Sequence, residues 1–344
     1  MSDLLCRPLT REEMFRVIEG RGAAPRVPVM AHFWVNPSAF GEREALVSDV
    51  LSRYPMDMQA LWLRIPGVYD APDDDPSYRW SWKDAEASDR ALDNAGFISD
   101  WDEDFEPFLK DFPNPGYPGL TRDNPPRDGR YRLGCWWYFF FERFWSIRGM
   151  ENALTDFYTN PDEVHALFSR LADFYIRVIE RGHDEMGLDG IFTSDDLGTQ
   201  TSTFFSPAVF EEFFAPYYEK VIRRVHELGM HFWLHACGNI ESLLPRFIDL
   251  GIDVIHPIQK YTMDERRIAA AYGDRISIWS GFDVQQIIPY GTPDDVRREV
   301  RYLIDTYRRS DGRFMLTLGN GATPDTPIES LSALLDEAFT YGQN

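Results

Sequence analysis

The stretch SPAVFEEFFAPYYEKVIRRVHELGMHFWLHACGNIESLLPRFIDLGIDVIHPI, residues 206–258, decides the fold. A helical segment is predicted at 207–229, opened by Ser-Pro in the cap and first-turn positions, and it leads into an apolar run at 230–236. A second helical segment at 239–250 leads into a second apolar run at 253–258. Long amphipathic segments that alternate with short β-branched or aromatic runs indicate a parallel sheet joined by crossover helices.

The same alternation recurs along the chain. We predict strands at 27–33, 57–63, 131–137, 189–195, 230–236, 253–258, 276–282 and 314–319. We predict helices at 42–54, 161–187, 207–229, 239–250, 263–273, 293–309 and 327–341. Eight strand-then-helix units favour an α/β protein of the (β/α)8 or TIM-barrel class, whose typical ~250 residues leave room for an N-terminal helix and one long insertion. A doubly wound open sheet is the competing layout.

The insertion is predicted at 64–130, after the second strand, where a segment rich in Asp and Pro has no strand–helix rhythm. We expect it to cap the barrel mouth, with a surface excursion as the alternative. The sequence has no internal repeat and no low-complexity tract. Residues 1–344 are therefore interpreted as one domain.

Composition and charge limit the classes of partner. With 344 residues, 44% of them hydrophobic, the chain can bury a large core. Its 56 acidic and 35 basic residues give a formal charge of −21, which repels nucleic acid and anionic lipid, so neither is expected as a partner. No stretch approaches the roughly 20 apolar residues of a membrane span, and the first residues lack the order of a signal peptide. Three scattered cysteines, Cys6, Cys135 and Cys237, are typical of a reducing compartment, and we expect a cytoplasmic protein.

Polar side chains gather at the predicted strand ends, which is where the active site of a (β/α)8 barrel lies. They are His32 after the first strand, Asp195, Asp196 and Gln200 after the fourth, His235 and Cys237 after the fifth, His256 and Gln259 after the sixth, Asp283 after the seventh and Asn320 after the eighth. We expect these side chains to face one common mouth.

The pair His235 and Cys237 is a candidate metal site. Successive side chains of a strand alternate between its faces, so these two point the same way and can share one ion. Zinc accepts imidazole and thiolate ligands, and a catalytic zinc needs three protein ligands with a fourth position open. The alternative is a hydrogen-bonded core histidine beside a small buried cysteine.

Two further motifs carry candidate residues. In TSDDLGTQTS (193–202), Asp195 and Asp196 can provide a general base, a metal ligand or a substrate clamp, or they can be turn and capping residues. In CWWYFFFERFW (135–145), Trp137 and its neighbours can stack on an aromatic or methylated ligand, or they can belong to the core.

Four blocks, taken in order, resemble the uroporphyrinogen decarboxylase superfamily, which contains the haem-pathway decarboxylase and zinc-dependent corrinoid methyltransferases. The blocks are SDDLGTQTSTFFSPAVFEEFFAPYYEKVI (194–222), HFWLHACGNIESLLPRFIDLGIDVI (231–255), SGFDVQQIIPYGTPDDV (280–296) and LTLGNGATPDTPIESL (316–331). The likeness covers about 150–342, and it implies a (β/α)8 barrel.

The resemblance also favours the methyltransferase branch. The decarboxylase carries an N-terminal arginine motif for the substrate's carboxylates, whereas RVPVMAHFWVNPSAFG (26–41) has only Arg26. The methyltransferases use a His-x-Cys pair and a later cysteine as zinc ligands, and His235 and Cys237 match the pair. Asn320 stands where the later cysteine is expected, so Asp195, Asp196 or another carboxylate would have to complete the site.

The resemblance therefore implies methyl transfer between a small methylated substrate or a thiol and a corrinoid carried by a partner protein, with zinc as the Lewis acid. Such substrates include a methyl ether, for O-demethylation, or a methylated amine. The catalytic candidates are Asp195, Asp196 and Asp283, the metal ligands His235 and Cys237, and the substrate-binding candidates His32, Trp137, Gln200, His256, Gln259 and Asn320.

Two other functions stay open from the sequence. In the first, the protein decarboxylates a pyrrole-type acid, the aspartates stabilise a protonated ring and no metal is needed. In the second, it is a non-catalytic ligand-binding barrel with an unreactive Cys237. Neither of these two functions requires a metal, whereas the methyltransferase is expected to bind zinc.

Overall fold

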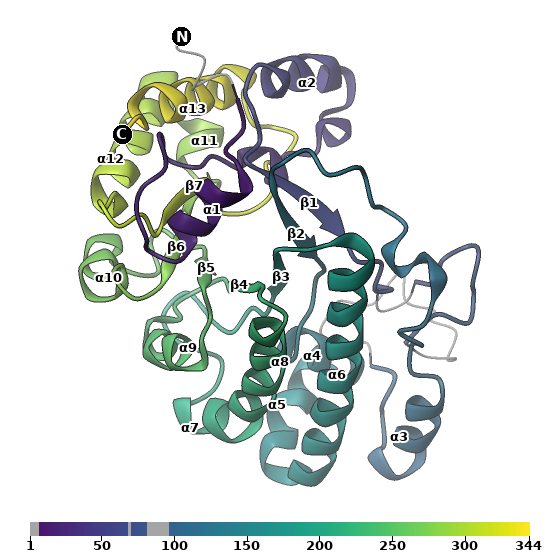
Figure 1. Ribbon diagram of the computed structural model, residues 1–344. Helices are drawn as coiled ribbons and strands as arrows, with labels where there is room; N and C mark the ends of the chain where they lie inside the picture. The colour runs from purple at the N-terminus through teal and green to yellow at the C-terminus, as the bar shows by residue number, and fades with distance from the viewer. Residues whose placement is uncertain (1–6, 68–69, 81–95) are drawn as a thin grey trace.

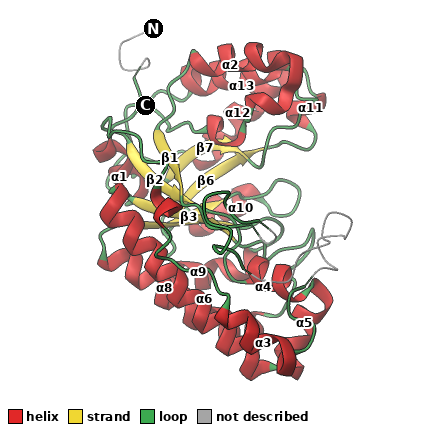
Figure 2. Cartoon of the chain, turned by 90° about the vertical axis from the view of Figure 1, so that its right-hand side faces the viewer, coloured by secondary structure: helices red, strands yellow, loops and turns green. Residues whose placement is uncertain are grey.

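The computed structural model describes residues 7–67, 70–80 and 96–344, and it has an α/β architecture built around a curled parallel sheet (Figure 1). Figure 2 shows the strands at the centre of the molecule, with helices packed on either side of them. The arrangement confirms the α/β class and is TIM-barrel-like. Cys6 lies outside the described residues, and so do 68–69 and 81–95 of the predicted insertion.

Each strand of the described sheet pairs in parallel with the next strand along the chain, in the order β1 to β7. The strands are β1 (Met58–Trp62), β2 (Tyr131–Cys135), β3 (Gly190–Ser194), β4 (His231–His235), β5 (Val254–His256), β6 (Ser277–Phe282) and β7 (Phe314–Leu318). Because all strands run the same way, their carboxyl ends lie at one edge of the sheet, and the loops that follow them share one face of the molecule.

Helices fill the connections, and every predicted helical segment contains helix. The α-helices are α1 (Arg11–Ile18), α2 (Glu44–Ser52), α3 (Trp101–Lys110), α4 (Phe141–Arg148), α5 (Met150–Thr159), α6 (Pro161–Arg181), α7 (Pro207–Val209), α8 (Ala215–Glu227), α9 (Leu244–Leu250), α10 (Glu265–Tyr272), α11 (Ile287–Tyr290), α12 (Pro293–Tyr307) and α13 (Ile328–Tyr341). The 3-10 helices are η2 (Ala31–Trp34), η3 (Pro37–Arg43), η5 (Pro118–Thr121) and η8 (Glu241–Leu243), and the π-helices are η6 (Gly182–Met186) and η7 (Phe210–Phe214). Over the described ranges, no helix combines the length and apolarity of a membrane span.

The predicted first strand at 27–33 is wrong. Val29 makes a single parallel bridge to Leu316 of β7, and the chain then turns into η2. Pro28 has no N–H to donate to a neighbouring strand, and the Val29 N–H donates instead to the buried Asp57 carboxylate at 2.7 Å. The insertion predicted after the second strand therefore follows β1, the first strand of the sheet.

Helix α4 is not predicted by the apolar pattern, because seven of its eight residues are buried, so it has no exposed polar stripe. It begins at Phe141, inside the aromatic run that follows β2. Glu142, Arg143 and Arg148 are among its buried residues, and such charged groups need partners inside the protein. This helix therefore brings ionisable groups beside the carboxyl ends of β2 and β3.

Helix α1 covers the opposite, amino ends of the strands. The Phe15 ring packs against Tyr131 at 5.5 Å and against His231 at 4.6 Å between ring centroids. The Ser277 hydroxyl donates to the Ile18 carbonyl at 2.8 Å. These contacts close one end of the sheet, which leaves the carboxyl ends as the open face.

Candidate functional site

Three potential metal ligands meet where β3 and β4 end. The two strands pair with Ser194 opposite His235, so Asp196 and Cys237 follow the strands at neighbouring positions. The ligand atoms of Asp196, His235 and Cys237 all lie within 4.8 Å of one another. His235 Nε2 is 3.3 Å from Cys237 Sγ and 3.5 Å from Asp196 Oδ1. We call these three residues the ligand cluster.

A chain of hydrogen bonds fixes the tautomer of His235. His256 Nε2 lies 2.9 Å from the Leu318 carbonyl, which can only accept, so this nitrogen carries a proton. Burial lowers the pKa of both imidazoles, which are therefore neutral. His256 Nδ1 then accepts from His235 Nδ1 at 2.7 Å, and the lone pair of His235 Nε2 faces Cys237 and Asp196. This is the tautomer that a metal requires.

The backbone holds Cys237 close to Asp196. The Cys237 N–H donates to Asp196 Oδ1 at 2.8 Å. At Gly238 φ is +84°, and a Cβ there would lie 2.3 Å from the backbone of Gly198, so only glycine allows the two loops to approach this closely. Burial raises the pKa of the Cys237 thiol, and the nearby acids Asp196 and Glu142 raise it further. The thiol is therefore protonated in the absence of a cation, and a bound cation would lower its pKa.

Asp195, next to Asp196 in the sequence, has a different environment. It is fully buried, and its carboxylate accepts from the Glu142 N–H at 2.9 Å, the Tyr218 hydroxyl at 2.6 Å and the Phe140 N–H at 3.3 Å. Burial raises its pKa to about 7, although these hydrogen bonds act in the opposite direction. Asp195 thus joins the start of α4 to α8, whereas Asp196 faces the ligand cluster.

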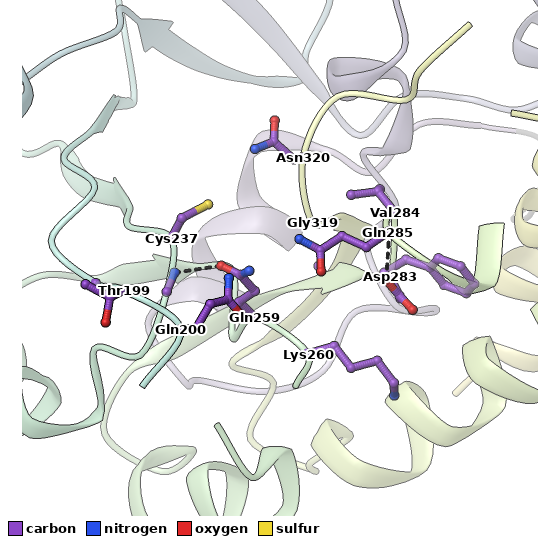
Figure 3. A pocket seen from close by; sticks show the side chains of 14 residues that line it. Thr199, Gln200, Cys237, Gln259, Lys260, Asp283, Val284, Gln285, Gly319 and Asn320 are labelled. Atoms are coloured by element: carbon purple, nitrogen blue, oxygen red, sulfur yellow. Dashed lines mark hydrogen bonds between the residues drawn. The ribbon is translucent and has the colours of Figure 1, made fainter. Parts of the chain in front are cut away.

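A first cavity, of about 410 Å³, opens beside Cys237 (Figure 3). Its polar side chains are Thr199, Gln200, Gln259, Lys260, Asp283, Gln285 and Asn320. Gln259 Oε1 accepts from the Gly238 N–H at 2.6 Å, and Asp283 accepts from the Gln285 N–H at 2.9 Å. The Lys260 ammonium contacts two carboxylates. We call this space the polar cavity, and its free groups are mainly amides.

A second cavity, of about 440 Å³, lies against the other members of the ligand cluster, His235 and Asp196. Its wall is built from Trp34, Trp62, Trp136, Trp137 and Tyr138, with Glu142 and Ser194 beside them. We call this space the aromatic cavity. Asn320 borders both cavities, so the ligand cluster lies between two spaces of different chemistry.

The structure brings most of the predicted residues together. Gln200, Gln259, Asp283 and Asn320 line the polar cavity, and Trp137, Asp196 and His235 line the aromatic cavity. His256 is fully buried behind His235, so its contact is with the ligand cluster. His32 bonds to the Leu51 carbonyl at 3.0 Å and lines neither cavity.

Sequence reasoning missed Glu142. This residue is buried, accepts from the Ser194 hydroxyl and lines the aromatic cavity. Burial raises the pKa of its carboxyl well above the usual value, and Asp196 and Asp195 add to the effect. One feature of the sequence could have indicated this residue, because it is the single acid in the aromatic run CWWYFFFERFW. Burying a carboxyl group among aromatic rings costs free energy, so such a residue is a candidate functional group.

Known proteins resemble this chain in sequence. Methylated-thiol–coenzyme M methyltransferase of Methanosarcina mazei is 26% identical over 187 residues, which are 54% of this chain and 47% of the relative. Methylcobamide:CoM methyltransferase of the same organism is 27% identical over 184 residues, 54% of this chain and 51% of the relative. Uroporphyrinogen decarboxylase of Synechococcus sp. is 27% identical over 179 residues, 51% of this chain and 47% of the relative. The chain spans about half the length of the curated relatives it matches.

A solved structure of a methyltransferase from Methanosarcina mazei superposes with a TM-score of 0.60 over 97% of this chain and 99% of that one, at 15% identity. This likeness shows a shared fold. Residues 145–341, more than half of the chain, match the family described as uroporphyrinogen decarboxylase (URO-D). The resemblance inferred from the four sequence blocks is confirmed, and the chain belongs to the URO-D family.

Proposed function

We propose that this protein is a methyltransferase that moves a methyl group between a small methylated substrate or thiol and a corrinoid carried by a separate protein. The observation that carries the proposal is the ligand cluster, in which imidazole, thiol and carboxylate groups converge between two cavities. Methyltransferases whose names include coenzyme M are among the relatives, and one name includes methylcobamide.

The residues of the ligand cluster fit a zinc ion. His235 presents a neutral nitrogen lone pair, Cys237 a thiol and Asp196 a carboxylate, and zinc binds all three donor types. Three protein ligands leave a position for a reactant. A zinc ion held there would lower the pKa of a bound thiol or polarise a methylated substrate.

The surrounding residues would position the reactants. His256 would keep the His235 ring in its ligating orientation through their 2.7 Å hydrogen bond. The amides of Gln200 and Asn320 can each donate and accept, so they would orient a polar reactant in the polar cavity. Gln259 would hold the loop that carries Cys237 through the Gly238 N–H.

The charges of the cavities favour this function over decarboxylation of a pyrrole-type acid. Within the described residues, the linings of the two cavities contain no arginine. Lys260, the only basic amine that the described part of these linings contains, lies 2.5 Å from the Glu299 carboxylate and 3.4 Å from that of Glu265. A substrate with several carboxylates would therefore find no unpaired cation among the described lining residues.

The test is the zinc content of the purified protein together with methyl transfer from free methylcobalamin to 2-mercaptoethanesulfonate. We expect about one zinc ion per chain in the wild type, and its loss with the activity in Cys237→Ala. Cys135→Ala is the matched control, because Cys135 is a buried free thiol on β2 outside both cavities. Wild-type protein that binds no added zinc, or a Cys237→Ala variant that keeps it, would contradict the proposal.

A further inference from the structure

The aromatic cavity has an open wall of indole rings. The Trp62 and Trp137 ring centroids are 5.5 Å apart, and those of Trp34 and Trp137 are 5.7 Å apart. Phe33 stacks on Trp62 at 5.8 Å with an interplanar angle of 16° and supports the wall. Trp62 and Trp137 are each 38% exposed, so part of their large apolar surface remains free for a ligand.

The wall of this cavity carries acidic side chains. Glu142 and Asp196 line it, and within the described residues its lining contains no lysine or arginine. The buried Arg143 lies nearby, with its guanidinium carbon 4.2 Å from the Trp80 ring centroid and 5.3 Å from that of Tyr138. Arg143 also donates to the Trp137 carbonyl at 3.4 Å, and its charge partly offsets the raised pKa of Glu142 from behind the wall. Among the described lining residues, Asp196 is the acidic group without a lysine or arginine beside it on the wall.

We propose that the aromatic cavity binds a quaternary methylammonium cation, which serves as the methyl donor. The electron-rich faces of tryptophan attract quaternary ammonium groups, and in the metal-free protein Asp196, an acidic group on the same wall, adds to the attraction. A neutral methyl ether would gain only from packing on the rings, and an aromatic acid would be repelled by Asp196. The assignment as donor rests on the proposed function, whereas the binding of the cation does not.

The chemistry of such a donor balances without an added acid. When the methyl group leaves, the C–N bond breaks and its electron pair stays on nitrogen, so the cation becomes a neutral tertiary amine and needs no proton. The acceptor supplies both electrons of the new bond to carbon. If the acceptor is the cobalt(I) corrinoid of the proposed function, the cobalt is formally oxidised to cobalt(III), and no further oxidant or reductant is required.

Calorimetric titration tests the binding step. The probes are choline and 3,3-dimethylbutan-1-ol, its neutral isostere with carbon in place of nitrogen, each titrated into wild-type protein with and without zinc. We expect choline to bind at least about tenfold more tightly than the neutral alcohol. Equal affinities, or no choline binding at millimolar concentrations, would overturn the proposal.

Three variants locate the binding site. Trp137→Leu and Trp62→Leu are each expected to weaken choline binding by about tenfold and to weaken binding of the neutral alcohol less. Phe204→Leu is the control, because Phe204 is also 38% exposed but lines neither cavity. If thermal melting shows that one of the two cavity variants is unfolded, the other carries the test. Unchanged choline affinity in the folded cavity variants would overturn the assignment to this cavity.

The donor step has a separate readout, which is dimethylaminoethanol formed from choline in the presence of free cob(I)alamin. Its formation by wild type but not by Trp137→Leu would support the assignment. If choline binds and no product forms, although the protein transfers methyl groups from methylcobalamin to a thiol, the donor assignment fails and the proposed function stands. If choline binds but the protein takes up no zinc and methylates no thiol, the proposed function fails and the cation site stands.

Discussion

The two cavities beside the ligand cluster differ in chemistry and in origin. The polar cavity is built from the loops after β3 to β7 and offers glycine backbone and amide side chains. The aromatic cavity is built mainly from η2 and the ends of β1 and β2 and offers indole rings and carboxylates. Because Asn320 borders both, two reactants of unlike polarity can approach the same three ligands from different sides. The predictions below separate effects on the ligand cluster from effects on either cavity.

The largest effect is expected from Asp196→Ala, which removes one of the three proposed ligands. Zinc affinity should fall by roughly a hundredfold or more, and methyl transfer should fall with it, whichever cavity holds the donor. Competition with a chromogenic chelator measures the affinity. The matched variant is Glu211→Ala, since Glu211 is an exposed acid on η7 that pairs with Arg246 away from both cavities. A zinc affinity equal to that of the wild type would remove Asp196 from the ligand set.

His256→Leu should have the next largest effect. The variant removes the acceptor that orients His235 Nδ1–H, so we expect zinc affinity to fall about 10- to 100-fold while choline binding in the aromatic cavity changes little. The same chelator competition and calorimetry measure both quantities. His256→Asn restores an acceptor at this position and should recover part of the zinc affinity, whereas a purely steric role for His256 predicts no such recovery.

Asp195→Asn tests the contrast between the two neighbouring aspartates. An amide places its NH2 group against donors that now converge on the carboxylate, so the free energy of unfolding should fall by about 1–3 kcal/mol. Zinc affinity should stay near the wild-type value. Urea denaturation and chelator competition measure the two effects, and a loss of zinc without a loss of stability would reverse the roles assigned to Asp195 and Asp196.

The same variant carries a pH prediction. In the folded protein the Asp195 pKa is raised to about 7, above its unfolded value near 4, so between these pH values the folded state holds a proton that the unfolded chain has released. This contribution to stability is present at acidic pH and is lost as the pH rises through 7. Asp195→Asn, which does not titrate, should therefore lose less stability than wild type between pH 5.5 and 7.5. Identical pH slopes in urea denaturation would contradict this.

The smallest effect is expected in the polar cavity. Gln200→Ala removes one exposed amide, and we expect the KM for the thiol to rise several-fold with little change in kcat. Choline binding should not change, because Gln200 does not line the aromatic cavity. Steady-state kinetics with methylcobalamin and 2-mercaptoethanesulfonate measures the first quantity. A changed choline affinity would show that the two cavities are not independent.

Much of the fold could be predicted from the sequence, because strand and helix periodicities are local. The two exceptions have identifiable physical causes. The segment around Val29 has the composition of a strand, but Pro28 lacks a donor and Asp57, distant in sequence, takes the Val29 N–H. Helix α4 is buried nearly all round, so its pattern shows no polar stripe.

The candidate site was harder to predict, because it depends on which way neighbouring side chains point. Spacing alone placed His235 and Cys237 on one face, and the structure brings them together. Spacing could not distinguish Asp195 from Asp196, since the difference depends on Tyr218 and on the start of α4. The position of His256 behind His235 follows from strand pairing between β4 and β5, which no sequence motif records.

The most direct measurement is the X-ray absorption spectrum at the zinc edge of the zinc-loaded protein. A site built from Asp196, His235 and Cys237 should show one sulfur neighbour at about 2.3 Å and two or three nitrogen or oxygen neighbours at about 2.0–2.2 Å. The sulfur signal should disappear in Cys237→Ala. A spectrum with no sulfur neighbour in wild type, or a protein that binds no zinc to measure, would contradict the ligand cluster as a metal centre.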